Sequence, residues 1–331
     1  MTEARQKRVL ITGITGFAGS HLAEHCLRCG LRVCGLTRKS RAAENLKRIR
    51  HEVELIEGDL ADEQLPEHML KEVRPHLIFH LAGQTFYQSQ GSQLLNTNIL
   101  GTLNLLEGCA KLMPAPLVHI ASSSAVYGGT DRPLEAVTET TPLNPIDAYG
   151  LSKATQDLLA GWFHRSHGLP IVRTRAFNHT GPREREEFIC STIAKQIAEI
   201  EQGLCPPRIS IGNVETERDF SDVRDIVRGY YLALQRGQPG EIYNLASGQA
   251  LSIASILQRL MDISDVRAEV VQDPGRMRTS DVPCQIGDYS KAKRQLGWNP
   301  EILFDQSLRD LLDYWRQKIS TRIVKTDVSK R

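Results

Sequence analysis

The sequence predicts an α/β fold, a doubly wound parallel sheet followed by a smaller C-terminal α/β lobe, and three observations support this. Residues 8–122 alternate short β-rich apolar segments with amphipathic stretches of helical length, as in parallel strands joined by helical crossovers. The strand segments are apolar throughout, which is typical of strands covered on both faces. After about residue 178 the pattern loosens into shorter elements.

The order of these elements divides the chain into three predicted regions. Residues 1–177 form the sheet domain, with parts of the later chain returning to it; residues 178–316 mainly form the lobe, and residues 317–331 form a frayed polar tail. The expected helices cover residues 17–29, 41–49, 63–73, 92–112, about 146–167, 187–202, 222–236 and 252–262.

The composition excludes several classes of partner. The chain has 331 residues and a formal charge of +2, so it lacks the broad basic field that nucleic acid or an anionic membrane would select. Its N-terminal segment has no signal-like or membrane-spanning apolar run, and we expect a soluble cytoplasmic protein. The seven cysteines suit reduced thiols. Cys26 and Cys29 lack a second pair of metal ligands, so we expect no metal site.

A glycine-rich turn follows the first expected strand. Gly13, Gly16 and Gly19 have G-x-x-G-x-x-G spacing and open the first helix, which is the context of a dinucleotide-binding loop of Rossmann type. The glycines let backbone N–H groups approach a pyrophosphate at the positive helix end. We expect Thr15 and Phe17 of the same turn to contact the dinucleotide.

The end of the second expected strand indicates which dinucleotide binds. A carboxylate here would bind a free ribose 2′-hydroxyl, whereas a basic residue accommodates a 2′-phosphate. The chain has Thr37 and Arg38, followed by Lys39 and Arg41. This pattern favours NADP(H) over NAD(H). We expect the remaining cofactor contacts after the third and fourth strands, from Asp59, Leu60, Leu81, Ala82 and Gln84.

Tyr149 and Lys153 form the candidate reacting centre. They lie four residues apart at the start of an expected helix and so share one face. A nearby ammonium favours a phenolate, so we expect Lys153 to lower the pKa of Tyr149. Ser123, in the serine run after the fifth strand, would place a second hydroxyl at the same oxygen.

The motifs together resemble the extended short-chain dehydrogenases/reductases that act on nucleotide sugars. The general family likeness is carried by "TGITGFAGSHL", "IFHLAGQTF", "NILGTLNLLE", "SSSAVYG" and "DAYGLSK". The segments "FNHTGP", "GNVETERDFSDVRD" and "RMRTSDV" point to the GDP-sugar branch, which contains GDP-4-keto-6-deoxy-D-mannose reductases and GDP-mannose 4,6-dehydratases.

This resemblance implies a set of roles. Ser123, Tyr149 and Lys153 would be catalytic, and NADPH would reduce the C4 ketone of a GDP-4-keto-6-deoxy-hexose. Similar dehydratases carry an acid at the position of Ala125. The alanine therefore makes a dehydratase function less favoured without excluding it. Some of the reductases also carry an acid near this site, so the alanine departs from their pattern as well. Relatives generally dimerise through the helix that carries the tyrosine, so we expect a homodimer.

The resemblance also implies the substrate contacts. Arg218 and Arg278 would clamp the diphosphate, because a nearly neutral protein needs specific arginines for it. The further candidates for substrate contact are Thr85, Ser123, Ser124, Asn178, Lys195 and Asp281.

Two other functions remain open. A UDP-hexose 4-epimerase would use the same serine, tyrosine and lysine with a retained NAD, although Arg38 favours exchangeable NADPH. A non-catalytic dinucleotide sensor would have no need of the paired hydroxyls.

Overall fold

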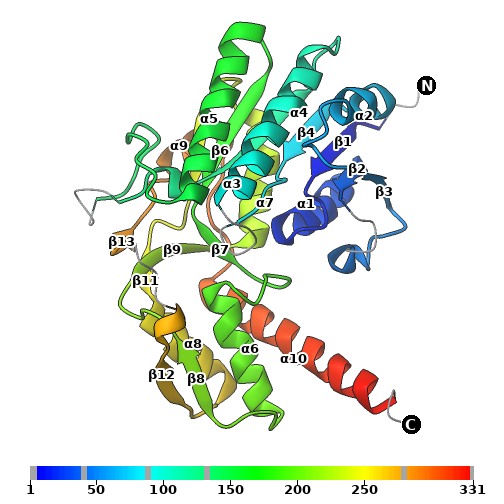
Figure 1. Ribbon diagram of the computed structural model, residues 1–331. Helices are drawn as coiled ribbons and strands as arrows, with labels where there is room; N and C mark the ends of the chain where they lie inside the picture. Colours follow the sequence, from blue (N-terminus) through cyan, green and yellow to red (C-terminus); the bar gives the residue numbers. More distant parts are fainter. Residues whose placement is uncertain (1–5, 39–42, 86–90, 130–134, 277–281, 329–331) are drawn as a thin grey trace.

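The computed structural model describes residues 6–38, 43–85, 91–129, 135–276 and 282–328, with side chains to residue 323 (Figure 1). Its large sheet has seven strands in the order β10-β6-β5-β4-β1-β2-β3. All of its pairings are parallel. The strands are β1 (Arg8–Thr12), β2 (Arg32–Thr37), β3 (Val53–Glu57), β4 (Leu77–His80), β5 (Leu117–Ser123), β6 (Ile171–Ala176) and β10 (Ile242–Leu245).

Helices cover both faces of this sheet, as the apolar strands predicted. One face packs against α1 (Phe17–Arg28), α7 (Val223–Arg236) and α9 (Ser290–Leu296). The other packs against α2 (Leu65–Val73), α4 (Gly101–Ala110) and α5 (Ala148–His167). Before α4 lie α3 (Gly91–Leu95) and the π-helical turn η3 (Asn96–Leu100). The fold-class prediction is confirmed.

The strand order places the candidate site. The chain proceeds outward from β1 to β3 on one side, then returns through β4 to β6 on the other. In such a doubly wound sheet, ligands bind outside the carboxyl ends of the strands where the order reverses, here between β1 and β4. The sequence motifs follow β1, β2, β4 and β5, so the sheet gathers them at one edge.

The lobe lies beyond this edge (Figure 1). Its helices α6 (Ile189–Glu201), α8 (Ile253–Ser264) and α10 (Phe304–Val328) share one core. Strand β9 (Glu217–Asp222) pairs with β7 (Asn178–Thr180), β11 (Ala250–Ser252) and β13 (Cys284–Gln285), and β8 (Arg208–Ile211) pairs with β12 (Glu269–Gln272). Between them, α7, β10 and α9 return to the large sheet.

Two predictions about local structure were wrong. The expected helix over residues 41–49 is, in its described part, only the 3-10 turn η2 (Glu44–Leu46), followed by turns. The expected polar tail continues α10 as far as Val328. Ile319 explains this difference, because it is 3% exposed within the lobe's core and so stabilises a helix whose sequence is largely polar. No described helix has both the length and the apolar character to span a bilayer.

Candidate functional site

The glycine loop has the geometry that a pyrophosphate requires. Gly13 has a φ of +75°, and a Cβ on Gly19 would lie 2.2 Å from the Gly13 carbonyl oxygen, so neither position tolerates a side chain. Gly16 precedes α1, and no side chain caps this helix or adds an acid to its first turn. The first N–H groups of α1 are thus left to an anionic ligand, and the residues present fit the predicted cofactor.

The flanking residues shape this loop. The Thr15 carbonyl oxygen accepts a hydrogen bond from Asn45 Nδ2, 3.0 Å away. The Phe17 ring stacks on His179, with ring centroids 5.8 Å apart and planes inclined by 13°. This contact joins α1 to β7, and burial lowers the pKa of His179. Its Nδ1 bonds the Phe177 carbonyl oxygen at 3.0 Å, so the imidazole has a structural contact to backbone.

The end of β2 presents the residues predicted to select the cofactor. Thr37 is buried, and its carbonyl oxygen accepts a hydrogen bond from Gly58 N, at the end of β3. Arg38 follows and is exposed. Lys39 and Arg41 lie outside the described residues. A cationic guanidinium thus stands where an NAD-specific site has a carboxylate.

The ends of β3 and β4 lie beside this point. Asp59 is exposed, and its Oδ1 accepts a hydrogen bond from Ala61 N, while Leu60 is buried against Gly101. Ala82 N donates to Thr12 Oγ1 at 3.1 Å, which fixes the β4 loop to β1. Leu81 lies between this loop and β4, where its N–H donates to the Thr12 carbonyl oxygen.

Gln84 is the predicted cofactor contact with the most informative environment. Its side chain is 5% exposed, and its Oε1 has no hydrogen-bond partner in the described structure. A buried acceptor without a donor is costly, which fits a site completed by a bound ligand. Its backbone is fixed on both sides by Asn98, which accepts from Gln84 N at 2.7 Å and donates to Gln84 O at 3.0 Å.

Ser123 and Tyr149 meet at the carboxyl edge of β5. Ser123 caps the 3-10 turn η4 (Ser124–Val126), where its Oγ accepts a hydrogen bond from Ala125 N at 3.2 Å. Asp147 caps α5 by accepting from Gly150 N, which sets Tyr149 in the first turn. The Ser123 side chain lies close enough to the Tyr149 phenol to lower its pKa. The structure therefore brings together the two groups predicted to flank a carbonyl oxygen.

Lys153 stands one turn further along α5. It is 7% exposed, and its Nζ donates a 2.9 Å hydrogen bond to the Ala121 carbonyl oxygen of β5. The same Nζ lies 6.0 Å from the centre of the Tyr149 ring. Lys153 thus sits between β5 and the end of β4, beside the glycine-loop edge, and can serve both a ribose and the tyrosine.

The predicted lowering of the Tyr149 pKa was wrong for the side chains as they lie. Burial raises the pKa of Tyr149 and outweighs the lowering by Ser123. Burial also lowers the pKa of Lys153 to about 8. Lys153 Nζ donates its hydrogen bond to a backbone carbonyl oxygen rather than to the phenol, so this bond does not favour the phenolate directly.

The remaining candidate substrate residues lie in different parts of the molecule. Asn178, on β7, faces Phe220 of β9 in register, and Arg218 of β9 faces Gln285 of β13, whose amide donates to the Ser124 carbonyl oxygen. Arg218 is therefore linked through Gln285 to the serine turn, whereas Asn178 lies on the neighbouring strand of the lobe. Thr85 is the last described residue of the β4 loop. Arg278 and Asp281 lie outside the described residues.

Lys195 is less available than predicted. It lies on α6 and forms ion pairs with Glu186 and Glu199, with its Nζ 5.9 Å from the centre of the Trp315 ring. These partners neutralise its charge, so a role in holding a diphosphate would require it to leave them.

Residues that sequence analysis did not include also organise the site. Asn98 Nδ2 donates to Ser152 Oγ of α5 as well as to Gln84 O, so one buried amide joins the β4 loop to the helix that carries Tyr149. His80 Nδ1 and Nε2 bond Thr12 and Thr102 below the same edge. The histidine has no sequence signal beyond its place at a strand end.

Cys26 and Cys29 show no metal-site geometry. Cys26 is fully buried in the core against the sheet, whereas Cys29 is exposed beside His25, with its Sγ 3.7 Å from Nε2. Burial raises the pKa of the Cys26 thiol well above its usual range. Within the described residues, no three metal-ligating side chains form a group.

Comparison with known proteins places the chain in a family. The sequence model described as GDP-mannose 4,6 dehydratase matches residues 10–311. The chain belongs to this family. The "GDP-6-deoxy-D-mannose reductase" of Pseudomonas aeruginosa is 32% identical over 317 residues, which cover 95% of this chain and 98% of the relative. The recognition of a short-chain dehydrogenase/reductase enzyme of GDP-sugar metabolism is therefore confirmed.

Solved structures of relatives share the whole fold. RMD from Pseudomonas aeruginosa, complexed with NADPH, has a TM-score of 0.81 and 30% identity, over 95% of this chain and all of that one (100%). A UDP-glucose 4-epimerase from Thermotoga maritima, with UDP-glucose, has a TM-score of 0.85 and 27% identity, over 94% and 99%. Proteins similar to this chain thus share one fold but differ in the reaction that their names give.

Proposed function

We propose that this protein is an NADPH-dependent reductase that converts the C4 ketone of GDP-4-dehydro-6-deoxy-D-mannose into the alcohol of GDP-D-rhamnose. The observation that carries the proposal is that Ser123 and Tyr149 adjoin each other beside Lys153, at the edge where the glycine loop lies. The similarity to a GDP-6-deoxy-D-mannose reductase supports the substrate. Arg38 and the NADPH complex of a similar structure support the cofactor.

The chemistry needs one hydride and one proton. NADPH, when bound, supplies the hydride to C4 and leaves as NADP⁺. Tyr149 donates its phenolic proton to the carbonyl oxygen, and Ser123 holds that oxygen in place by a hydrogen bond. Lys153 stabilises the transient phenolate, which then recovers a proton from solvent. The ketone becomes a secondary alcohol, and the proximity of Ser123, Tyr149 and Lys153 supports these roles.

Ala125 separates this reaction from the elimination that defines the family's name. Loss of water across C5 and C6 requires a group that moves a proton. The methyl group of Ala125 can neither donate nor accept one. We therefore propose that the chain consumes a dehydratase product and does not make it.

The decisive assay supplies GDP-4-dehydro-6-deoxy-D-mannose, made by a family dehydratase, and follows the absorbance of NADPH. The expected result is one NADP⁺ per 6-deoxy sugar formed. Tyr149→Phe should lower kcat by about 10²- to 10⁴-fold, the usual share of a general acid, with the Kd of NADPH within about twofold of the original. Unchanged turnover of Tyr149→Phe would end the mechanism.

A 4-epimerase is the second candidate, because the similar Thermotoga maritima protein has that activity in its name. An epimerase oxidises and reduces the same carbon and keeps its NAD. Gentle denaturation of the purified protein distinguishes the two, since an epimerase releases stoichiometric NAD and the proposed reductase releases none. A second assay supplies UDP- and GDP-hexoses without added NADPH. An epimerase should convert one of these sugars, whereas the proposed reductase should convert none.

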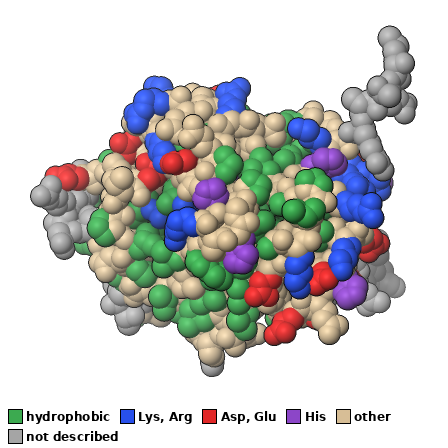
Figure 2. Space-filling model, turned by 90° about the horizontal axis from the view of Figure 1, so that it is seen from above, with side chains coloured by type: hydrophobic (Ala, Val, Ile, Leu, Met, Phe, Trp, Pro, Cys, Tyr) green, Lys and Arg blue, Asp and Glu red, His purple; other side chains and the backbone are tan. Residues whose placement is uncertain are grey.

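We also propose that the protein is a homodimer through α5. Leu151, Leu158 and Trp162 are exposed by 47%, 61% and 47%, at spacings of seven and four residues, so they form one stripe along the helix. Leu100 of the neighbouring η3 is 44% exposed. Figure 2 shows that hydrophobic side chains also lie across the middle of the face seen from above, so the helical spacing, rather than exposure itself, identifies the stripe.

A further inference from the structure

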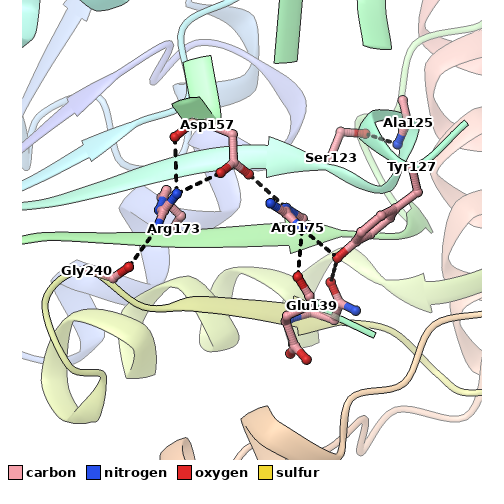
Figure 3. Close-up of polar contacts among 9 residues, drawn as sticks. Ser123, Ala125, Tyr127, Glu139, Asp157, Arg173, Arg175 and Gly240 are labelled. Carbon is pink, nitrogen blue, oxygen red and sulfur yellow. Dashed lines mark hydrogen bonds and ion pairs between the residues drawn. The ribbon is translucent and has the colours of Figure 1, made fainter. Parts of the chain in front are cut away.

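A buried charge network connects the catalytic helix to the sheet. Asp157 of α5 is 1% exposed and receives two arginines from β6 (Figure 3). Its Oδ2 accepts from Arg175 Nε at 2.8 Å, and its Oδ1 accepts from Arg173 Nη1 at 3.0 Å. Arg173 also donates to the Gly240 carbonyl oxygen at 2.5 Å. Arg173 thus ties Asp157 to the loop before β10, while Arg175 connects Asp157 to Tyr127.

The far side of Arg175 contacts the turn that follows the catalytic serine. Its Nη1 donates to Tyr127 Oη at 3.0 Å and to the Glu139 carbonyl oxygen at 3.2 Å, as Figure 3 shows. The guanidinium carbon lies 5.0 Å from the centre of the Tyr127 ring. Tyr127 in turn donates its only hydroxyl proton to Asn244 Oδ1 at 2.7 Å. The phenol therefore both accepts and donates, and it is held in one orientation.

These contacts join the same two segments as the reacting hydroxyls do. Asp157 is eight residues after Tyr149 on α5, and Tyr127 is four residues after Ser123. The intervening turn is also held by close packing, because a Cβ on Gly150 would lie 2.6 Å from the Ala125 carbonyl oxygen. The bridge Asp157–Arg175–Tyr127 is therefore a second connection between the serine turn and α5, besides the approach of Ser123 to Tyr149.

We propose that Arg175 and Tyr127 are positioning residues for the Ser123–Tyr149 pair: their bridge to Asp157 fixes the distance between the serine turn and the catalytic helix. The inference rests on the proposed function for its kinetic consequence, but not for its geometric one. A planar guanidinium suits the task because its N–H groups have fixed directions and its charge cannot be removed. Proximity effects in catalysis are steep, so small displacements of the hydroxyls lower the rate.

Tyr127→Phe tests the bridge with little change of shape. It removes the hydroxyl that links Arg175 to Asn244 and keeps the ring and the Arg175–Asp157 ion pair. Tyr243→Phe is the matched control, since Tyr243 is also fully buried. Its hydroxyl also makes two hydrogen bonds, with Gln238 N and Gln295 Oε1, and these join β10 to the α9 region. Arg175→Lys is the second variant, because it keeps the positive charge but loses the planar guanidinium with its N–H groups in fixed directions.

Three readouts separate positioning from stability. In Tyr127→Phe and Arg175→Lys, kcat should fall by about tenfold with KM within about twofold, because the loss is in the reacting geometry. On a Ser123→Ala background, Tyr127→Phe should lower kcat by a clearly smaller factor than it does in the original protein, because the two residues act together. The alkaline titration of Tyr149, read as the tyrosinate absorbance lost in Tyr149→Phe, should move to higher pH in Tyr127→Phe as the lowering by Ser123 weakens. Tyr243→Phe should change none of the three.

These experiments distinguish a wrong positioning role for Arg175 and Tyr127 from a wrong proposed function. If the protein turns over no GDP-4-dehydro-6-deoxy-sugar, the function is wrong, but the tyrosinate titration still decides the geometric inference without substrate. A Tyr149 titration unchanged in Tyr127→Phe overturns the inference. So does an equal loss of kcat in Tyr127→Phe and Tyr243→Phe, which would show a general effect of a lost buried hydroxyl.

Discussion

Lys153 donates its hydrogen bond to the Ala121 carbonyl oxygen, 2.9 Å away, and so ties the helix that carries Tyr149 to the strand that ends at Ser123. Burial holds the pKa of this lysine at about 8. The side chain therefore carries its charge below pH 8 and is a neutral amine above it. This places a change of charge at the cofactor edge within an accessible range of pH.

The first prediction concerns cofactor affinity and pH. The ammonium form of Lys153 is the better partner for ribose hydroxyls and an anionic dinucleotide, so the Kd of NADPH should rise above pH 8, by up to about tenfold per pH unit. In Lys153→Met the Kd of NADPH at pH 7 should be larger than in the original protein. It should also stay nearly constant between pH 7 and 9.5. Fluorescence titration with NADPH measures both. Parallel pH profiles in the two proteins would contradict the assignment.

The second prediction concerns the choice between NADPH and NADH. Arg38→Asp places a carboxylate at the exposed end of β2, where it would repel a 2′-phosphate and accept a hydrogen bond from a free 2′-hydroxyl. The ratio of kcat/KM for NADPH to that for NADH should fall by about 10²-fold or more. Arg32→Ser, at the amino end of the same strand, is the control and should leave the ratio unchanged. An unchanged ratio in Arg38→Asp would assign the selectivity to other residues.

The third prediction concerns a buried carboxyl in the lobe. Glu184 is 5% exposed and accepts a hydrogen bond from Thr180 Oγ1, and burial raises its pKa from 4.5 to about 8. Between these two values the unfolded chain has lost the proton and the folded chain keeps it. Stability should therefore fall as pH rises through this window and then level off.

Glu184→Gln removes this proton linkage and keeps an acceptor for Thr180. The variant should be more stable than the original by ~2–4 kcal/mol at pH 8.5, and nearly equal to it at pH 5. Urea unfolding at the two pH values measures the difference. Glu187→Gln is the control, because Arg185 lowers the pKa of Glu187, so this variant should gain nothing at pH 8.5. A pH-independent gain in Glu184→Gln would refute the linkage.

The fourth prediction concerns the α5 stripe. Leu158→Lys combined with Trp162→Glu places two charges in the proposed dimer interface and should give a monomer by light scattering at micromolar concentration, because unpaired charges are costly to bury. Leu303→Lys is the control; Leu303 is 79% exposed at the start of the α10 segment, away from α5. A monomeric original protein, or a dimer that survives the double substitution, would reject the interface.

The parts of the fold that follow from local pattern could be predicted. Apolar strand segments, the glycine loop and the Tyr149–Lys153 spacing depend on residues that are near one another in the chain. The predicted helix over residues 41–49 is wrong in its described part, although Leu46 and Ile49 are buried in the core as an apolar helix face would be: the 3-10 turn η2 and the turns after it achieve the same burial. The prediction of a frayed tail was wrong because the lobe's core covers Ile319. This burial is a tertiary contact that no local sequence pattern reveals.

The sequence by itself determined the doubly wound sheet, the cofactor loop at the end of β1, the basic end of β2 and the identity of the paired hydroxyls. These depend on residue type and short spacing, which backbone geometry converts directly into structure. Only the tertiary structure decided the protonation of the site and the network that holds it. The pKa of Tyr149 and Lys153 depends on burial, and the Asp157–Arg175–Tyr127 bridge joins residues that are brought together from three distant segments.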